Sequence, residues 1–520
     1  CSLLGVEVRI LSPALSFLEQ RNSGANATFP PLSFSMISKK LIVSALTLTA
    51  LYFPSHLISG EPLSTVVVKN KLERAVGFYQ RFVSINGGYL WRYSGDLKLR
   101  EGEGQASEHT AWVQPPGTPS VGQAFLDAFR LCDEPFLLDA AIKCGEALVH
   151  GQLVSGGWDY RIEFLPESRK RYAYRTDVKD PSGRRNVTTL DDNTTQSALS
   201  FLMRLDHELE FKHQSIHEAT TTALESLLNA QYPNGGWPQR FNTPPRPEDF
   251  PVKRAGYPKE WSRKYEGKDY RSYYTFNDNS IADTINVMLD AAIIYNNPKY
   301  RTAALKAGDF ILMSQMPEPQ PAWSQQYNHD GHPAWARKFE PPAITGGESQ
   351  GIMRVLMSLY ERTGEERFLK PIPPAINYLR KSMLPNGQLA RFYELKTNKP
   401  LFFTRDYKLT YDDSDMPTHY AFKVGSSLDS IERQFNRLLK DGPTLSHDLF
   451  SQAKLQLTKT LTKQTTEILS TLDDRGAWTE DSTLKYQNQE YDGPIIDMRS
   501  FARNVVTLAT YLGATVDDPK

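Results

Sequence analysis

Cysteine is nearly absent from this chain: only three occur in 520 residues. A framework of several disulfides is therefore excluded as a source of stability. Cys132 and Cys144 fall on two consecutive predicted helices. One bond between them is conceivable in an oxidising compartment, but sequence alone does not give the distance that a disulfide requires, so this pairing stays open.

An excess of charge of either sign is also missing. Lys plus Arg and Asp plus Glu each number 60, so the formal net charge is zero. Without a global charge the chain has no general attraction to nucleic acid or to a membrane surface. We therefore expect no nucleic-acid partner, and any affinity for a charged polymer must come from a local patch.

Apolar runs of membrane-spanning length are missing as well. The run at residues 41–53 follows two lysines and precedes small residues near position 60, but it is too short to span a bilayer comfortably. These features are typical of a signal peptide. With Met36 as the true start, we predict an untranslated or disordered upstream segment at residues 1–35 and a signal peptide at residues 36–60. The mature protein is then expected to be a secreted or periplasmic monomer, with no stable membrane insertion.

Helical periodicity dominates from residue 64 onward, and convincing alternating strands are few. Apolar residues recur three and four positions apart in two clear stretches: Ala198, Phe201, Leu202, Leu205 and Leu209, and Ile281, Ile285, Met288, Leu289 and Ala292. This spacing places the apolar side chains on one face of a helix. We therefore predict an all-α fold.

A short glycine-containing loop, mostly with an aromatic residue, returns between the predicted helix pairs. Its copies are Asn86-Gly-Gly-Tyr89, Ser155-Gly-Gly-Trp158, Asn234-Gly-Gly-Trp237, Asn386-Gly-Gln-Leu389 and Arg475-Gly-Ala-Trp478, with Pro321-Ala-Trp323 as a degenerate copy. The intervals leave room for two helices each, which predicts repeated αα-hairpins. Because the intervals are uneven, we favour an α/α toroid with long rim loops, formed by residues 61–520 as one domain. The longest irregular stretch, residues 242–272, either walls a cleft or is a solvated insertion.

Polar and acidic residues mark three predicted helix starts: Leu190-Asp191-Asp192-Asn193, Phe276-Asn277-Asp278-Asn279 and Thr345-Gly346-Gly347-Glu348. In a toroid the inner helices run parallel, so these N-termini gather at one end, where their dipoles favour anions. Capping alone would explain a single residue of this kind. Three aspartates exceed what caps need, and a hard cation such as calcium takes several oxygen ligands. Asp191, Asp192 and Asp278 are therefore candidate ligands of a calcium ion.

Arginine and tryptophan side chains stand near these helix starts in the sequence, among them Trp237, Trp335, Arg337, Arg391 and Arg405. Arginine presents a planar fork to a carboxylate, and an aromatic face can stack on a sugar ring. A single arginine is more often part of a structural ion pair. The combination favours a carboxylated sugar as ligand.

Several separated motifs, in the same order, resemble the pectate lyases of polysaccharide lyase family ten. They are Asn234-Gly-Gly-Trp-Pro-Gln-Arg-Phe241, Thr275-Phe-Asn-Asp-Asn279, Pro333-Ala-Trp-Ala-Arg-Lys-Phe-Glu-Pro-Pro342 with Gly347-Glu-Ser349, and Ala390-Arg-Phe-Tyr-Glu394 with Arg405-Asp406. The resemblance covers residues 187–413 and leaves the helical flanks unaccounted for. Trp323-Ser-Gln-Gln-Tyr327 departs from the family's usual Trp-Cys-Ala-Gln-His, which affects fine substrate contacts but no expected metal ligand.

The resemblance implies a calcium-dependent pectate lyase that cleaves α-1,4-linked polygalacturonate by β-elimination. By motif, Asp278 matches the family's second metal-site aspartate, and Arg337 matches its catalytic base. The first metal-site aspartate is Asp191 or Asp192, depending on how the following helix is aligned.

Substrate contacts are implied for four further residues. Arg391 and Arg405 match the family's substrate-binding arginines, and Trp237 and Asn279 come from the same motifs. An arginine base is chemically unusual, because a guanidinium is almost always protonated. The expected account is that calcium on the sugar carboxylate acidifies the C5 proton, while neighbouring cations disfavour the charged guanidinium.

Two other functions fit the same predicted fold. Glycoside hydrolases on α/α toroids use two carboxylic acids, and Asp191 and Asp278 could be such a pair. A carbohydrate-binding toroid without catalysis is the non-enzymatic alternative. Loss of activity on chelation would separate the lyase from the hydrolase, and a turnover assay would separate both from a binding protein.

Overall fold

The structure is a computed structural model that describes residues 63–445, 448–451, 454–487 and 489–516. The predicted upstream segment and signal peptide lie outside the described residues. By its contacts the chain from Leu63 onward is one compact unit. None of the helices in the described residues has the length and apolar character needed to cross a membrane.

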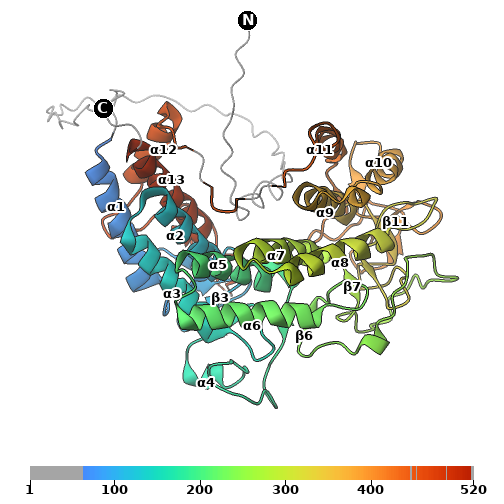
Figure 1. Cartoon of the computed structure of the whole chain (residues 1–520), viewed down its shortest axis with the longest axis horizontal. Helices are drawn as coiled ribbons and strands as arrows, with labels where there is room; N and C mark the ends of the chain where they lie inside the picture. The colour runs from blue at the N-terminus through green and yellow to red at the C-terminus, as the bar shows by residue number, and fades with distance from the viewer. Residues whose placement is uncertain (1–62, 446–447, 452–453, 488, 517–520) are drawn as a thin grey trace, which may run out of the picture. The chain divides into compact units, whose positions relative to one another are not determined.

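Two series of helices alternate along the chain (Figure 1). The inner helices, so named here because they contact one another in the order α13, α2, α5, α7, α9, α11, are α2 (Thr118–Cys132), α5 (Thr194–Glu208), α7 (Ser280–Ile294), α9 (Glu348–Thr363), α11 (Leu428–Asp441) and α13 (Met498–Val516). The outer helices are α1 (Thr65–Phe78), α3 (Pro135–Gly151), α6 (Gln214–Ala230), α8 (Pro298–Ser314), α10 (Ile372–Lys381) and α12 (Lys459–Ser470). Short helical turns complete the set: η1 (Tyr79–Val83), α4 (Pro166–Arg169), η2 (Asp191–Asn193), η3 (Pro247–Asp249), η4 (Asn277–Asn279) and η5 (Glu366–Phe368).

Apolar burial explains why these segments are helical. On α7, Ile281, Ile285 and Met288 are at most 1% exposed and repeat at the spacing of one helix face. The outer helix α8 begins at Pro298, a residue that fits the first helical position, and Asn297 caps it by accepting a hydrogen bond from the Lys299 N–H at 3.2 Å. The prediction of an all-α toroid of helical hairpins is confirmed.

The glycine loops follow the outer helices, and their tryptophans anchor them. In four copies the indole N–H donates to a carbonyl near the end of the preceding outer helix: Trp158 to Leu148, Trp237 to Leu227, Trp323 to Ile311 and Trp478 to Ile468, at 2.8–2.9 Å. A buried indole needs such an acceptor. Pro321-Ala-Trp323 is therefore a true copy of the loop.

Glycine is required in four of these loops, because each of the four approaches the next outer helix closely. Gly235 has φ +98°, and a Cβ there would lie 2.0 Å from the Lys306 carbonyl oxygen of α8. Gly476, in the last copy, has φ +97° and makes the same approach to Arg74 of α1. The repeat therefore continues from the last loop to the first outer helix, and α13 packs against α2.

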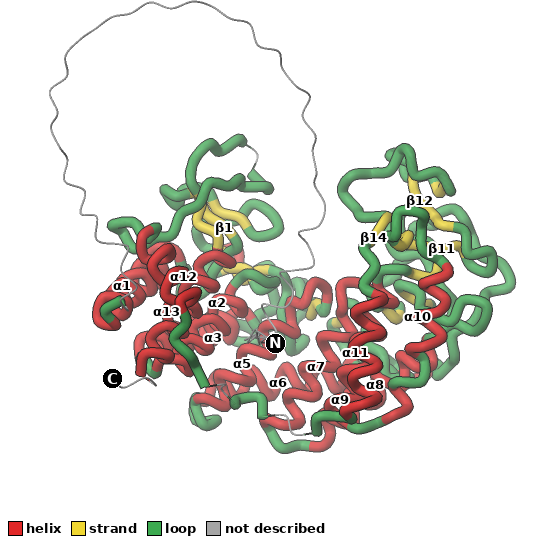
Figure 2. Tube along the Cα trace, turned by 90° about the horizontal axis from the view of Figure 1, so that it is seen from above, coloured by secondary structure: helices red, strands yellow, loops and turns green. Residues whose placement is uncertain are grey.

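Short antiparallel strands occupy the segments between the loops and the inner helices. They are β1 (Arg92–Ser94), β2 (Arg100–Glu101), β3 (Thr110–Trp112), β4 (Arg161–Glu163), β5 (Thr188–Thr189), β6 (Arg240–Phe241), β7 (Tyr274–Thr275), β8 (Gln326–Tyr327), β9 (Ala343–Thr345), β10 (Leu389–Ala390), β11 (Phe392–Glu394), β12 (Pro400–Phe403), β13 (Leu409–Thr410), β14 (Lys423–Val424) and β15 (Ile495–Asp497). They form sheets in the orders β15-β1-β2 and β13-β12-β11-β9, and the pairs β10-β14, β3-β4, β5-β6 and β7-β8. In Figure 2, β1, β11, β12 and β14 lie on one side of the helices.

The two central cysteines do not pair. Cys132 is partly buried, Cys144 is fully buried, and both are free thiols. Burial raises the pKa of the Cys144 thiol well above its usual range. It therefore acts as a small apolar residue of the core.

Candidate metal and catalytic site

Three inner helices begin with the same threonine-led turn. The hydroxyl oxygens of Thr189, Thr275 and Thr345 each accept a hydrogen bond from the backbone N–H two residues on, at 3.1–3.2 Å. Three residues after each threonine stands a carboxylate: Asp192, Asp278 or Glu348. The three turns are therefore equivalent positions of one repeat.

Two of these carboxylates, those of Asp192 and Asp278, stand on residues whose backbone is in the strained left-handed region. Asp192 has φ +49° and Asp278 has φ +46°, and the asparagine that follows each is also left-handed. Such angles are costly outside glycine and concentrate at functional sites. Neither α5 nor α7 has a side-chain cap hydrogen bond at its N-terminus, so capping does not explain these residues.

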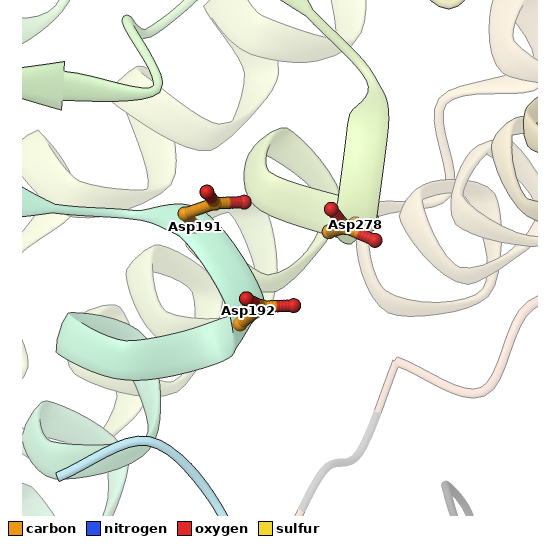
Figure 3. A group of neighbouring side chains, drawn as sticks. All are labelled: Asp191, Asp192 and Asp278. Atoms are coloured by element: carbon orange, nitrogen blue, oxygen red, sulfur yellow. The ribbon is translucent and has the colours of Figure 1, made fainter. Parts of the chain in front are cut away.

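The two turns lie against each other and bring the predicted aspartates together. Asp191, Asp192 and Asp278 each offer a carboxylate oxygen, and these oxygens all lie within 4.8 Å of one another. Figure 3 shows the three side chains, two from the start of α5 and one from the start of α7. The predicted convergence of these helix N-termini is confirmed.

Asp191 is held from one side only. Its Oδ2 accepts hydrogen bonds from the Tyr160 hydroxyl at 3.0 Å and from the Arg240 guanidinium at 3.3 Å. The pairing of β5 with β6, which sets Thr189 opposite Arg240, brings this arginine to the site. The Oδ1 atom of Asp191 is buried without a hydrogen-bond partner. A buried acceptor of this kind calls for a ligand that supplies positive charge.

The charge on Asp278 is disfavoured in the absence of a cation. Burial, and next the neighbouring Asp191 carboxylate, raise the pKa of Asp278 to about 6, although Arg337 opposes the rise. Crowded carboxylates with an unpartnered oxygen fit the ligand set of a hard divalent cation such as calcium. The residues present therefore suit the metal that the sequence predicts.

Glu348, the carboxylate of the third threonine-led turn, pairs with Arg391 and does not join the aspartate cluster. Its Oε1 accepts a hydrogen bond from Arg391 at 2.7 Å, and Thr345 donates to its Oε2. The antiparallel pairing of β9 with β11, with Thr345 opposite Phe392, sets Arg391 at this position. Tyr420 lies under the guanidinium, with 4.7 Å from its ring centroid to the Arg391 Cζ.

Arg337, the predicted base, is tied to Glu340. Its Nε and Nη2 donate to the two oxygens of that carboxylate at 2.8 and 2.5 Å, and its own backbone N–H donates at 3.0 Å. The Tyr420 hydroxyl donates to the same carboxylate at 3.0 Å. The Glu340 side chain is 3% exposed, whereas that of Arg337 is 40% exposed and can meet a ligand.

The electrostatics of Arg337 differ from the expected account. Burial by itself would lower the pKa of Arg337, but the hydrogen bonds and charge of Glu340 outweigh it and raise that pKa above its ordinary value. We expected neighbouring cations to disfavour the charged guanidinium, and the structure instead places an acidic partner on it. A base role for Arg337 therefore requires that this pairing loosen when substrate binds.

The remaining predicted substrate residues do not all reach the site. Trp237 is 1% exposed and anchors its loop to α6, so a sugar ring has no access to its face in this structure. Arg405 lies on the β12–β13 turn and pairs with Asp415 at 3.2 Å. Asn279, next to Asp278, is partly buried beside α9, where a Cβ on Gly351 would lie 3.4 Å from its Oδ1.

Sequence reasoning assigned no site role to Tyr160, Arg240, Glu340 or Tyr420, and it placed Glu348 at a converging helix start without giving it a role. Arg240, Glu340 and Glu348 stand inside the family motifs, and the threonine spacing shared with Asp192 and Asp278 would have singled out Glu348. The two tyrosines carry no local signal, because strand pairing and a distant loop bring them in.

Comparison with known proteins agrees with the motifs. Residues 152–388 match the family model described as pectic acid lyase. No curated protein matches the chain. The matched segment contains the three aspartates and Arg337, but it ends before Arg391 and Arg405.

Solved structures with a similar fold include two of a family 10 polysaccharide lyase from Cellvibrio cellulosa. The one in complex with trigalacturonic acid is 21% identical, covering 57% of this chain and 92% of that chain at a TM-score of 0.43. The other is 22% identical, covering 57% and 91% at a TM-score of 0.42. A D-mannose isomerase is 12% identical and covers 88% and 100% at a TM-score of 0.42. Likenesses at these scores carry no functional inference.

The family match, on the segment that holds both the carboxylate cluster and its arginine, identifies the enzyme class. This chain is a polysaccharide lyase, and its residues 152–388 belong to the pectic acid lyase family.

Proposed function

We propose that this enzyme cleaves α-1,4-linked polygalacturonate by calcium-dependent β-elimination, with Arg337 as the base. The observation that carries the proposal is the cluster of Asp191, Asp192 and Asp278, whose carboxylate oxygens lie within 4.8 Å of one another. Arg337 and Arg391 stand close enough to interact electrostatically with Asp278. A hydrolase would need two isolated carboxylic acids on either side of a glycosidic bond. Three crowded carboxylates suit a metal better.

In the proposed site, Asp191, Asp192 and Asp278 would hold calcium, which supplies positive charge to the C6 carboxylate of the sugar and so acidifies its C5 proton. Arg391, already fixed by Glu348 and Tyr420, binds and orients a uronate carboxylate. Its planar fork suits this task, and its anchors keep it in place before substrate arrives.

Elimination breaks the C5–H and C4–O bonds and forms a C4=C5 double bond. Arg337, with its side chain partly exposed, removes the C5 proton as the C4–O bond breaks, leaving a C4=C5 double bond in one product. The departing oxygen takes a proton from water, and the hydroxide that remains takes up the proton that Arg337 removed, so the guanidine is restored. Glu340 positions Arg337 in the resting enzyme. Its hydrogen bonds to the guanidinium must weaken when substrate binds, because they favour the protonated form of Arg337.

The exposed Arg405 is paired with Asp415 in this structure. In this proposal it contacts the substrate only after that ion pair has broken. Asn279 lies next to the metal cluster and contributes a further amide to it or to the sugar.

We also propose that residues from Leu63 onward act as one catalytic domain and that the protein is exported, as the apolar run before it and a cell-wall substrate together suggest.

The test combines activity with metal binding. The purified chain is incubated with polygalacturonate, with calcium or with a chelator, and the ultraviolet absorbance of the unsaturated product is followed. A calcium-dependent rise is expected. New reducing ends without absorbance would identify a hydrolase, and binding without turnover would identify a carbohydrate-binding protein.

Asp278→Asn provides the second arm, with Asp269→Asn as its control, because Asp269 is exposed and pairs with Arg271 on its own loop. Calcium should raise the melting temperature of the wild type and of the control, since a ligand stabilises the state that binds it. It should not raise that of Asp278→Asn. Equal calcium stabilisation of all three proteins would place the metal elsewhere.

A further inference from the structure

A cavity of about 680 Å³ lies beside the site just described and is not part of it. The loop at residues 242–272 forms one wall with Arg263, Lys264 and Tyr265, and the β12–β13 hairpin forms the other with Phe403 and Tyr407. Its volume falls within the roughly 300–1,000 Å³ that is typical of small-ligand pockets. The long loop therefore walls a cleft, which was one of the two interpretations of its sequence.

The wall is held firmly in place. The Trp335 indole N–H donates to the Ser262 carbonyl at 2.8 Å, and its ring lies edge-on to Phe403 with 6.1 Å between centroids. Arg263 bridges to Glu394 and to the Tyr411 hydroxyl, linking the loop to the hairpin. Aromatic side chains therefore line a cavity whose two walls are fixed before any ligand arrives.

The lining is cationic, and two of its charges are unmatched. Arg263 is paired with Glu394, and Lys408 is paired with Asp406. Among the described residues, no carboxylate lies within ion-pairing distance of Lys264 or Lys338, and none belongs to the lining. Lys338 instead lies 3.5 Å from the centroid of the Tyr407 ring. Two unmatched ammonium groups, one of them over the Tyr407 ring, suit an anionic ring-shaped ligand.

Its position relates this cavity to the proposed base. Trp335 and Lys338 line it, and Arg337 stands between them in the chain. The cavity therefore adjoins the chain segment that carries the proposed base. We propose that it is a distal subsite, which binds a further galacturonate residue of the same polygalacturonate chain through Lys264 and Lys338. This inference rests on the proposed function.

Lys264→Gln tests the subsite, alone and with Lys338→Gln. The matched control is Lys268→Gln, because Lys268 lies on the same loop, is exposed, pairs with Glu266 and does not line the cavity. The readout is the ratio of kcat/KM on polygalacturonate to kcat/KM on trigalacturonate. Removing one partly solvated charge contact should lower this ratio about threefold to fivefold, and removing both about tenfold. The control should keep the wild-type ratio.

A binding arm separates this inference from the proposed function. Polygalacturonate and fully methyl-esterified pectin are titrated calorimetrically into the wild type and Lys264→Gln in the presence of a chelator. If the wild type proves unable to cleave polygalacturonate, weaker binding of that polymer to Lys264→Gln would still support a uronate subsite. Equal affinity of the two proteins, an unchanged kcat/KM ratio, or an equal loss of affinity for the esterified polymer would each overturn it.

Discussion

Arg337→Ala tests the proposed chemistry most directly. Loss of the base should lower kcat on polygalacturonate by about 1,000-fold or more, equivalent to about 4 kcal/mol of barrier. Substrate affinity should change less, because Arg391 and the aspartate cluster remain. The rate is read from the absorbance of the unsaturated product over a range of substrate concentrations.

The structure also predicts a cost in stability. The variant removes two charge-assisted hydrogen bonds, of 2.8 and 2.5 Å, from the buried Glu340 carboxylate. That carboxylate keeps the hydrogen bonds from the residue 337 backbone N–H and from Tyr420. Because the Arg337 side chain is 40% exposed, we expect a loss of roughly 2–4 kcal/mol in the free energy of unfolding rather than the larger cost of a fully buried pair. Urea unfolding measures it.

Arg337→Lys is the control that separates these two effects. It keeps a positive charge beside Glu340 and should recover much of the stability, but a compact ammonium cannot reproduce the directed fork, so activity should stay low. A folded Arg337→Ala enzyme that retained a tenth of the wild-type kcat would refute the base assignment.

Three further variants address other parts of the structure. Arg391→Ala should raise KM for polygalacturonate more than it lowers kcat, and the reverse pattern in steady-state kinetics would make Arg391 a transition-state group. Trp237→Phe should lower the melting temperature without changing KM, because the indole anchors a loop and touches no sugar; a selective rise in KM would restore it to the substrate site. For Asp283, burial raises the pKa to about 8, so the folded state keeps a proton that the unfolded state loses, and stability should fall between about pH 4 and pH 8. Asp283→Asn should remove this fall in urea midpoints measured against pH, and parallel curves would contradict the argument.

Much of the scaffold could be predicted because the signals are local. Helical spacing at Ile281 and Ile285 and the recurring glycine loops fix the hairpins, and a left-handed glycine at position 235 is a local requirement. The strands could not be predicted, because pairs such as β5 with β6 are two residues long and carry no alternation. They form where distant loops meet.

Prediction of the site was uneven for a related reason. The aspartates could be proposed because they stand at the starts of two predicted helices, whereas the pairing of Arg337 with Glu340 depends on a local turn that the motif does not specify. Trp237 was misplaced because Asn-Gly-Gly-Trp looked like part of a substrate motif. The same tryptophan recurs as Trp158 and Trp478, with the same indole hydrogen bond to the preceding outer helix, and that recurrence marks it as a structural anchor.

The contact between the last loop and the first outer helix limits how this enzyme can be divided. A fragment restricted to the family-matched residues 152–388 would strip α2 from α5, and with it the close fit in which Gly122 leaves room for the Phe201 ring. In turn α2 relies on α13, more than 350 residues later, for its own packing. The polypeptide segment that holds the proposed chemistry is thus supported by helices from both ends of the folded chain. Its smallest stable unit is expected to be much larger than its catalytic segment.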